Sequence, residues 1–343
     1  MNKKMISLNQ LNKNELENIL NNVNKFKKKK YTNKYSGKVI GLLFEKFSTR
    51  TRLSFESAIS KLGAYPLFIN KDDTQLSRGE SIAETARMFS LYMDALIFRT
   101  NSHSKLIKFD DNSSIPVVNA LSDFEHPTQI ISDLYTIKEY FNKKALNKIK
   151  IVYVGDSNNI ANSFAYAAMI LKLNMIFCCP NKYNKSVKKI LKNNPNIDIT
   201  DNLIYASSNA DVIYTDVWTS MGMEKENKVR LKDFRNFQIN SKIMDNTNKK
   251  SVFMHCLPAH IDEEVTEEVI SSKKSIVYKQ AENKLYAAMS VIDYVLSWPS
   301  ISFDLLDLWN VIANLWASFL RFIKIFNGSI SLLNSTESFW FGK

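Results

Sequence analysis

Short apolar runs alternate with amphipathic helical patterns along most of this chain of 343 residues. Short apolar runs between turn signals are typical of buried strands, whereas apolar residues three and four positions apart are typical of helices. Repeated alternation of the two predicts an α/β protein with doubly wound parallel sheets. The expected strands are 38–45, 64–70, 95–99, 116–121, 150–155, 174–180, 211–217, 252–257 and 275–279.

The chain length favours two domains. A polar, lysine-rich stretch at 142–148 follows a long helical pattern, and we place the boundary there, with domains at 1–142 and 143–297. Residues 298–343 form a hydrophobic tail that we leave unassigned. The expected helices are 50–62, 79–92, 128–140, 160–173, 263–271 and 284–296, and leucines near the start of the chain indicate a first helix before these.

The composition limits both the cellular compartment that we expect for the protein and the classes of binding partner. The net charge is +12, but the lysine runs are not interleaved with aromatic residues, so nucleic-acid binding is not expected. Three cysteines, two of them adjacent, make a poor disulfide framework, and the first residues do not resemble a signal peptide. We therefore expect a cytoplasmic protein. No cysteine pair has the spacing of a zinc site, and we expect no metal.

The turn after the first expected strand is rich in hydroxyls and arginines. Ser48 to Arg52 read Ser-Thr-Arg-Thr-Arg and open a helix. Arginine is unfavourable at the positive end of a helix dipole unless an anion is bound there. Backbone N–H groups, hydroxyls and guanidinium groups would then converge on that anion, which predicts a phosphate site. The simpler alternative is a turn in which Ser48 caps the helix.

Other polar clusters also follow expected strands, and parallel sheets bind ligands at the carboxyl ends of their strands. Each cluster has a structural alternative: Arg99 as a strand edge in solvent, and His126 or Asp216 as a helix cap. The loop 73–80 is either a surface turn or a loop lent to a neighbouring subunit. The clusters are Arg99, His126–Gln129, Asn158–Asn159, Asp216–Gly222 and His255–Pro258.

Two competing readings of these clusters are disfavoured. The turn at 155–159 lacks the Gly-x-Gly-x-x-Gly spacing of a dinucleotide site, so no cofactor is expected. His255 and Cys256 are adjacent on a strand and face opposite ways, so they would not form a nucleophile and its base. A thiol that contacts substrate is the preferred interpretation of Cys256.

Taken together, these motifs resemble the aspartate/ornithine carbamoyltransferase family over about residues 6–297. Ser-Thr-Arg-Thr-Arg at 48–52 and His-Pro-Thr-Gln at 126–129 match motifs of the whole family. The segment 216–222, which contains Ser-Met-Gly, and His-Cys-Leu-Pro at 255–258 match its ornithine branch. The resemblance implies transfer of the carbamoyl group of carbamoyl phosphate to L-ornithine, giving L-citrulline and phosphate in arginine metabolism.

The resemblance also implies two domains with the active site in the cleft between them, a C-terminal helix that returns to the first domain, and a homotrimer with shared sites. Arg99, His126, Asp216 and Cys256 would be catalytic. Carbamoyl phosphate would be bound by Ser48, Thr49, Arg50, Thr51, Gln75 of the adjacent subunit, Arg99, His126, Gln129, Cys256, Leu257 and Lys284. Ornithine would be bound by Asn159, Asp216, Ser220 and Met221.

Two departures from the family pattern stand out. The family's Glu-Asn-Arg reads Glu-Asn-Lys here, so Lys284 offers a point charge where arginine offers a fork, and we expect weaker orientation of carbamoyl phosphate. The loop Leu-Gly-Arg-Gly-Glu reads Leu-Ser-Arg-Gly-Glu at 76–80. The tail is compatible with a helix packed on a subunit, a membrane-surface contact or a degenerate extension, and its uncharged core is too short to span a bilayer.

Two other functions stay open at this stage. One is a carbamoyltransferase for another amine or amino acid, and the other is a catalytically impaired homologue that serves as a binding or structural subunit. The sequence does not distinguish an anabolic from a catabolic direction.

Overall fold

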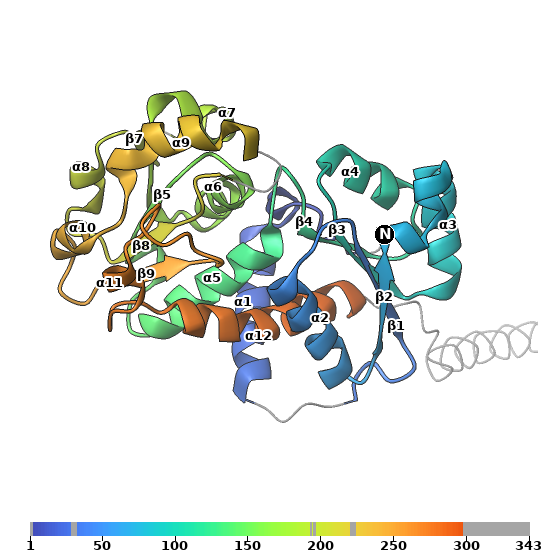
Figure 1. Cartoon of the computed structure of the whole chain (residues 1–343). Helices are drawn as coiled ribbons and strands as arrows, with labels where there is room; N and C mark the ends of the chain where they lie inside the picture. Colours follow the sequence, from blue (N-terminus) through green and yellow to red (C-terminus); the bar gives the residue numbers. More distant parts are fainter. Residues whose placement is uncertain (1–2, 29–32, 193, 195–196, 220–223, 298–343) are drawn as a thin grey trace, which may run out of the picture. The chain divides into compact units, whose positions relative to one another are not determined.

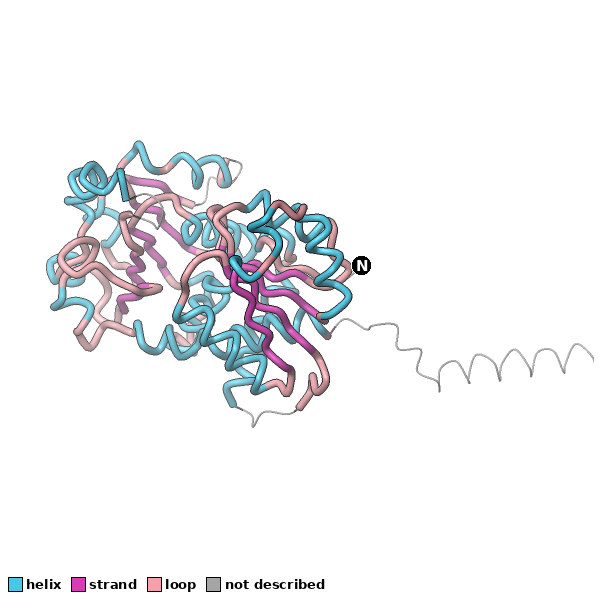
Figure 2. Tube along the Cα trace, turned by 45° about the vertical axis from the view of Figure 1, so that its right-hand side comes forward, coloured by secondary structure: helices cyan, strands magenta, loops and turns pink. Residues whose placement is uncertain are grey.

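The computed structural model describes residues 3–28, 33–192, 194, 197–219 and 224–297 (Figure 1). The hydrophobic tail and the expected ornithine contacts Ser220 and Met221 lie outside these residues. The described strands form two wholly parallel sheets with helices around them (Figure 2). The expectation of an α/β protein with doubly wound parallel sheets is confirmed.

The first sheet has the strand order β2-β1-β3-β4. Its strands are β1 (Val39–Phe44), β2 (Tyr65–Asn70), β3 (Ala95–Arg99) and β4 (Val117–Leu121). Its helices are α1 (Lys13–Lys28), α2 (Thr49–Lys61), α3 (Ile82–Tyr92), α4 (His103–Asp111) and α5 (Pro127–Tyr140). Side chains of α3 and α4 pack on one face of this sheet, and those of α1 and α2 pack on the other.

The second sheet has the strand order β7-β6-β5-β8-β9. Its strands are β5 (Lys150–Val154), β6 (Asn174–Cys178), β7 (Asp198–Thr200), β8 (Val212–Thr215) and β9 (Val252–His255). Its helices are α6 (Asn159–Leu171), α7 (Lys185–Ile190), α8 (Leu203–Ser207), α9 (Asn227–Phe234), α10 (Ser241–Asp245), α11 (Glu267–Ile270) and α12 (Val277–Leu296). Strand order reverses beside β1 in the first sheet and beside β5 in the second, and such switch points open the crevices in which ligands bind.

Helices α5 and α12 join the two sheets into one body. Every residue of α5 from Pro127 to Ile137 is buried, and α12 packs against α5, α1 and α2. One apolar core therefore contains side chains of both sheets together with both helices. Polar groups inside this contact are paired: Ser290 donates to the carbonyl oxygen of Ile19 at 2.7 Å, and Asn283 donates to Thr136 at 3.0 Å.

The expected strand at 275–279 is wrong. Ser275 forms only an isolated bridge with Phe253, and Val277 already begins α12. A short apolar run between turns is ambiguous between strand and buried helix. Tertiary contacts decide it here, because Gln280 in the first turn of α12 accepts a hydrogen bond from the backbone N–H of His255 at 3.0 Å.

The expected helix at 263–271 is shorter in the structure, where α11 covers only four residues. Val265 bridges Ile239 and Ile261, and the side chain of Glu264 is held by His255, so the segment before Thr266 does not become helical. Helix α4, strand β7 and the short helices α7 to α10 were not expected. Elements of so few residues carry too little periodicity to be recognised.

In the part of the chain that the structure describes, no helix has the length and apolar content to cross a membrane.

A buried carboxyl at the start of α5 makes folding sensitive to pH. Glu125 is fully buried, its Oε2 accepts the N–H of Leu8 at 3.1 Å, and its Oε1 has no partner among the described residues. Burial raises the pKa of Glu125 from 4.5 to about 7. The folded state therefore holds the Glu125 proton more tightly than the unfolded chain does. The resulting contribution to the free energy of unfolding is complete below pH 4.5 and is lost as the pH rises through 7.

We predict that Glu125→Gln removes this loss of stability. Between pH 5 and pH 8, the free energy of unfolding of the parent chain should fall by about 2–3 kcal/mol more than that of the variant. Urea denaturation at both pH values measures the difference, with Glu17→Gln on the exposed side of α1 as the control. Parallel pH dependence of parent and variant would contradict the assignment.

Candidate active site

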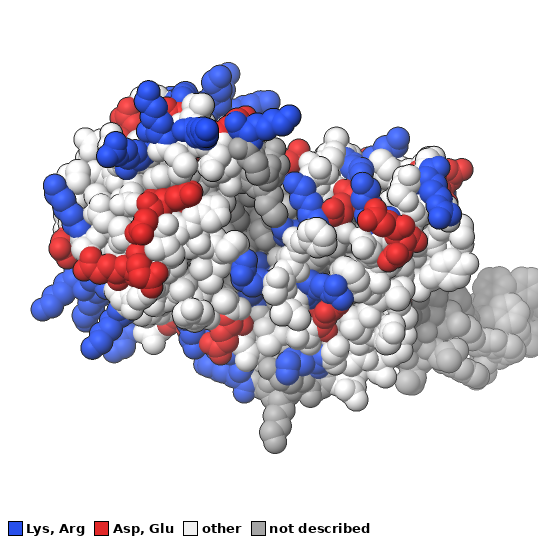
Figure 3. Space-filling model, viewed as in Figure 1, with Lys and Arg blue, Asp and Glu red and all other residues white. Residues whose placement is uncertain are grey.

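A cavity of about 650 Å³ lies where the two switch points face each other. The surface of the molecule is hollowed between its two lobes (Figure 3). Loops after β1, β3, β4, β5, β8 and β9 supply its walls, as the sequence predicts from the polar clusters at strand ends. Among the lining residues are Ser48, Thr49, Arg50, Thr51, Arg99, His126, Gln129, Asn158, Asn159, Asp216, Cys256, Leu257 and Lys284.

The loop after β1 brings the start of α2 to the cavity. Ser48 occupies the N-cap position in an extended conformation, but its side chain makes no capping hydrogen bond. The hydroxyl of Ser48 and the first N–H groups of α2 are therefore available to a ligand, and such groups favour an anion. Arg50 and Thr51 follow on the same turn and line the cavity.

Arg52, which the sequence groups with Arg50, does not line this cavity. Its guanidinium lies 3.5 Å from the ring centroid of Phe68, and its Nε pairs with Glu56 Oε1 at 3.0 Å. Arg52 lies two positions after Arg50 on a helix, and side chains at that spacing point in different directions. Only one of the two arginines is thus placed for a ligand in the cavity.

One end of the cavity is cationic. Arg99 is 5% exposed, and within the described residues its Nε has no hydrogen-bond partner and its guanidinium forms no ion pair. Burial and the nearby Arg50 lower the pKa of Arg99 to about 10, which leaves it protonated at neutral pH. Burial, reinforced by Lys284 and Arg99, lowers the pKa of His126 well below 6.5, so its imidazole is neutral. The side chain of His126 makes no capping hydrogen bond to α5, and its Nδ1 lies 3.5 Å from the Thr128 hydroxyl, so Nε2 is the ring nitrogen that can donate to a ligand.

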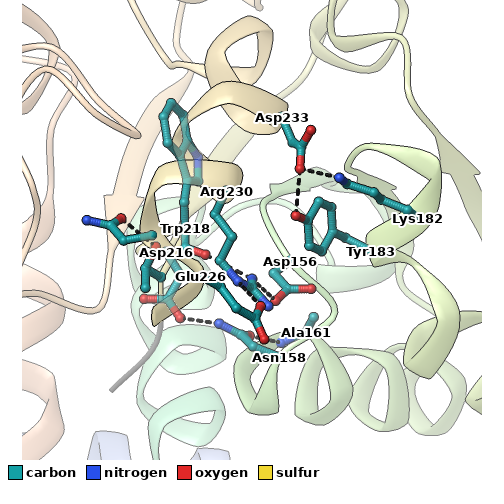
Figure 4. Close-up of polar contacts among 12 residues, drawn as sticks. Asp156, Asn158, Ala161, Lys182, Tyr183, Asp216, Trp218, Glu226, Arg230 and Asp233 are labelled. Atoms are coloured by element: carbon teal, nitrogen blue, oxygen red, sulfur yellow. Dashed lines mark hydrogen bonds and ion pairs between the residues drawn. The ribbon is translucent and has the colours of Figure 1, made fainter. Parts of the chain in front are cut away.

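The second sheet contributes a carboxylate to the cavity wall. Asp216 follows β8, is 7% exposed and forms no ion pair within the described residues. It accepts a hydrogen bond from Asn158 Nδ2 at 2.7 Å (Figure 4). It also accepts one from the Cys256 thiol at 3.0 Å, and it does not serve as a helix cap. A buried carboxylate that only neutral donors surround favours a cationic ligand group.

The turn after β5 places the amide of Asn158 as a donor to Asp216. Gly155 adopts φ 151°, a region that side chains rarely tolerate, and a Cβ there would lie 3.2 Å from the Tyr153 hydroxyl. Oδ1 of Asn158 caps α6 by accepting from two backbone N–H groups, which leaves its Nδ2 directed at Asp216. Asn159 lines the cavity, but its Nδ2 donates to the carbonyl oxygen of Ser122 at 2.8 Å.

A buried arginine ties the segment after Asp216 to this turn. Arg230 of α9 points toward Asp156, with which it pairs at 2.5 Å, and it also donates to the carbonyl oxygen of Trp218 at 3.1 Å (Figure 4). Glu226 holds the Nε of Arg230 at 2.9 Å. No sequence motif marks this cluster, because Arg230 lies outside the motifs and its partner Asp156 is distant in sequence.

His255 is structural, in agreement with the expectation that it cannot serve Cys256 as a base. Its Nε2 lies 3.1 Å from Glu264 Oε1, and its Nδ1 accepts the N–H of Leu257 at 2.8 Å. That contact holds Leu257 at φ 57°, a conformation uncommon for residues other than glycine. Burial and the adjacent Asp216 raise the pKa of the Cys256 thiol well above 9, so it stays protonated and does not act as a thiolate nucleophile.

Gln75 is the described site candidate that the structure does not bring to the cavity. It is exposed in a short 3₁₀ turn, η3 (Gln75–Arg78), and does not line the cavity of its own chain.

The carboxyl of Asp133 lies directly behind the cavity wall, where it accepts a hydrogen bond from Gln129. Asp133 is not among the residues predicted from the sequence. Its spacing of four residues from Gln129 on an expected helix was the available signal, since such pairs share a helix face.

Among the described residues, one group has the composition of a metal site: His260, Glu263 and Glu264, whose possible ligand atoms lie within 4.8 Å of one another. Oε1 of Glu264 already contacts the His255 ring and accepts the N–H of His260 at 2.7 Å. His260 is exposed. We assign this group a structural role.

Comparisons with known proteins agree with this geometry. Residues 3–139 match the model of the aspartate/ornithine carbamoyltransferase carbamoyl-P binding domain, and residues 147–295 match that of the Asp/Orn binding domain. The chain belongs to the aspartate/ornithine carbamoyltransferase family. It is therefore a carbamoyltransferase, as the resemblance of its motifs implied.

Individual members of the family are similar over most of their length. The ornithine carbamoyltransferase of Oceanobacillus iheyensis is 42% identical over 268 residues, which are 76% of this chain and 83% of that protein. The catabolic ornithine carbamoyltransferase of Thermoplasma volcanium is 40% identical over 295 residues, 83% of this chain and 96% of its own. The structure of the Pyrococcus furiosus ornithine carbamoyltransferase superposes with a TM-score of 0.81 at 38% identity and covers 87% of this chain and 98% of that one.

The protonation of Cys256 gives a test that does not depend on activity. We predict that iodoacetamide alkylates Cys256 only slowly near pH 8, with a rate still rising at pH 10. Asp216→Asn should move that rise to lower pH, because it removes the adjacent negative charge. Mass spectrometry after timed alkylation provides the rates, and Cys256→Ser gives the background from Cys178 and Cys179. A rate that levels off below pH 8 in the parent chain would mean that the thiol is activated.

Proposed function

We propose that this carbamoyltransferase converts carbamoyl phosphate and L-ornithine to L-citrulline and phosphate in arginine metabolism. The observation that supports this most is the separation of charge in the cavity. Arg50 and Arg99 reach the cavity from the first sheet, Lys284 from α12 and Asp216 from the second sheet, and Asp216 forms no ion pair within the described residues. A dianionic phosphate and an ammonium group are complementary to these charges.

In this proposal, residues 1–142 bind carbamoyl phosphate. The start of α2, with Ser48, Thr49, Arg50 and Thr51, holds the phosphate and neutralises the charge that grows on it as it leaves. Arg99 and neutral His126 donate to the carbamoyl oxygen. One preorganised donor of this kind typically contributes about 3–4 kcal/mol to the stability of the transition state.

Residues 143–297 bind ornithine in this proposal, through Asn159, Asp216, Ser220 and Met221. The δ-amine attacks the carbamoyl carbon as the free base, although a free alkylammonium titrates near ~10.4 and is mostly protonated at neutral pH. Asp216 attracts the ammonium form and accepts its proton. The new C–N bond forms as the bond from the carbamoyl carbon to the phosphate oxygen breaks, and the departing phosphate takes the electron pair. Cys256 and Leu257 lie between the two substrates.

Assembly and location extend the proposal. A homotrimer would bring Gln75 of one chain to the cavity of the next, which fits its exposure outside its own cavity. Exposed Leu91 and Tyr92 at the end of α3 offer apolar surface for such a contact. The free cysteines agree with a cytoplasmic location. Nucleic acid is not a proposed partner, because basic side chains on the face shown in Figure 3 are spread among acidic ones.

A colorimetric citrulline assay on the purified protein, with ornithine omitted as the control, tests the reaction. Two alternatives make different predictions. A carbamoyltransferase for another amine would carbamoylate another member of an amine panel supplied with labelled carbamoyl phosphate. A catalytically impaired homologue would bind carbamoyl phosphate without forming any product.

We predict that Arg50→Ala lowers the turnover number for citrulline by several orders of magnitude, whereas Arg52→Ala leaves it within about threefold of the parent value. Both arginines lie in the first turn of α2, but only Arg50 lines the cavity. Steady-state kinetics with both substrates saturating make the comparison. Equal losses in the two variants would show that the effect is on the helix rather than on a bound phosphate.

The pKa of Lys284 leads us to expect that KM for carbamoyl phosphate depends on pH. Burial lowers its pKa from 10.5 to about 8. As the pH rises through 8, Lys284 loses its proton and the cavity loses one positive charge. We predict that KM for carbamoyl phosphate rises above pH 8 and that Lys284→Arg abolishes this rise, because arginine stays protonated. KM measured from pH 6.5 to 9.5 in both proteins decides the point, and the same rise in both would exclude Lys284 as its source.

A further inference from the structure

The carboxylate of Asp133, which lies outside the cavity, accepts a hydrogen bond from Gln129, which lines it. Asp133 lies on α5, is fully buried and does not line the cavity. Its Oδ1 accepts hydrogen bonds from the side-chain amides of Gln129 at 2.9 Å and Gln280 at 2.8 Å. Its Oδ2 accepts from the Tyr214 hydroxyl at 2.8 Å. These three neutral donors come from α5, α12 and β8, so the carboxylate is held from three sides.

This arrangement allows only one orientation of the Gln129 carboxamide. Its Nε2 donates to Asp133, and its Oε1 accepts from the Lys284 ammonium. A rotation of the amide by half a turn would set two acceptors against each other at Asp133 and two donors against each other at Lys284. Both contacts would then be repulsive inside a buried region, where unpaired polar groups are costly.

The oxygen end of the Gln129 carboxamide lies beside Lys284, which lines the cavity, whereas its nitrogen end lies beside Asp133, which does not. The acceptor end is therefore the end on the side of the ligand. A carbonyl oxygen has two lone pairs, and Lys284 occupies one of them. The remaining acceptor matches an N–H group on the ligand, and a methyl group in that place would leave it unpaired.

We propose that Asp133 is a positioning residue that holds Gln129 as an acceptor and thereby makes the site select a carbamoyl group over an acetyl group on the same phosphate. This inference rests on the proposed function. Asp133 touches no ligand in it and acts through Gln129 and Lys284. Acetyl phosphate differs from carbamoyl phosphate by a methyl group in place of NH₂, and is therefore the matched probe.

Asp133 is also the buried negative charge that supports the charge of Lys284. The groups that face Lys284 come from several elements: Asp133 on α5, Cys256 after β9, Arg99 on β3, Arg50 on α2 and His126 before α5. The two arginines disfavour its protonated form, and Asp133 favours that form. Loss of the carboxylate charge would therefore lower the pKa of Lys284 further.

Two substitutions separate these effects. Asp133→Asn keeps an oxygen for both glutamine amides, so the orientation of Gln129 is retained while the charge is lost. Asp133→Leu removes every acceptor at similar size and releases the Gln129 carboxamide. Asp293→Asn is the control, because Asp293 is a buried carboxylate of α12 that pairs with Tyr35 and Lys34 away from the cavity.

Titration calorimetry with carbamoyl phosphate and acetyl phosphate measures both properties. In Asp133→Leu the dissociation constant for acetyl phosphate divided by that for carbamoyl phosphate should fall by about tenfold. Loss of charge at Lys284 weakens both ligands alike, and only carbamoyl phosphate also loses the acceptor on Gln129. In Asp133→Asn the ratio should stay near the parent value, while the pH above which carbamoyl phosphate binding weakens should move down by about one unit. Asp293→Asn should change neither quantity, whatever it costs in stability.

Unchanged selectivity in a folded Asp133→Leu variant, or an unmoved pH midpoint in Asp133→Asn, would overturn the inference. If Asp133→Leu does not fold, the pH midpoint of Asp133→Asn still decides. Failure of the proposed function looks different, because the parent chain would then bind no carbamoyl phosphate and form no citrulline. A parent chain that does both, beside variants that bind as it does, would reject only the role of Asp133.

Discussion

The contact between α5 and α12 is the constraint on which the rest of the structure depends. Helix α5 is buried for most of its length although it carries Gln129, Ser132, Asp133 and Thr136, and each of these needs a partner in an interior that water does not reach. Helix α12 helps to satisfy them through Gln280, Asn283 and Lys284. The helix pair that joins the two sheets therefore also carries the polar groups that reach the cavity. Stability and site geometry are set by the same side chains.

Charge in the cavity is distributed by burial as much as by residue type. His126 is kept neutral by burial and by the cations beside it, and the thiol of Cys256 is kept protonated by burial and by Asp216. Arg50 and Arg99 remain cationic without carboxylate partners among the described residues. A folded chain tolerates such unpaired charge where a ligand of opposite charge compensates it. These unpaired charges in the cavity are thus better explained by substrate binding than by stability.

Much of the fold and of the site was predictable because both depend on local patterns. Buried strands and the polar turns that follow them are continuous in sequence, so Ser48, Arg50 and His126 could be placed at strand ends before any contact was known. Contacts between residues that are distant in sequence could not be predicted from local patterns. The strand expected at 275–279 became the start of a helix because Gln280 is needed at His255, and Arg52 turned away to Phe68 although it shares a motif with Arg50. The Arg230 cluster joins residues more than 70 positions apart, such as Asp156, and no local pattern marks it.

The lysine at 284 is best understood together with Asp133. An arginine at this position would stay charged whatever surrounded it, whereas a buried lysine keeps its proton at neutral pH only if nearby groups favour the ammonium form. Asp133 lies behind Gln129, and burial raises the pKa of its carboxyl to about 6. Near neutral pH the carboxylate is ionised and Lys284 is protonated, so Gln129 is held between opposite charges. Below pH 6 the negative charge of Asp133 is lost, and above pH 8 the positive charge of Lys284 is lost, so Gln129 lies between opposite charges only between these limits. A lysine at this position thus makes the charge beside Gln129 depend on pH, which an arginine would not do.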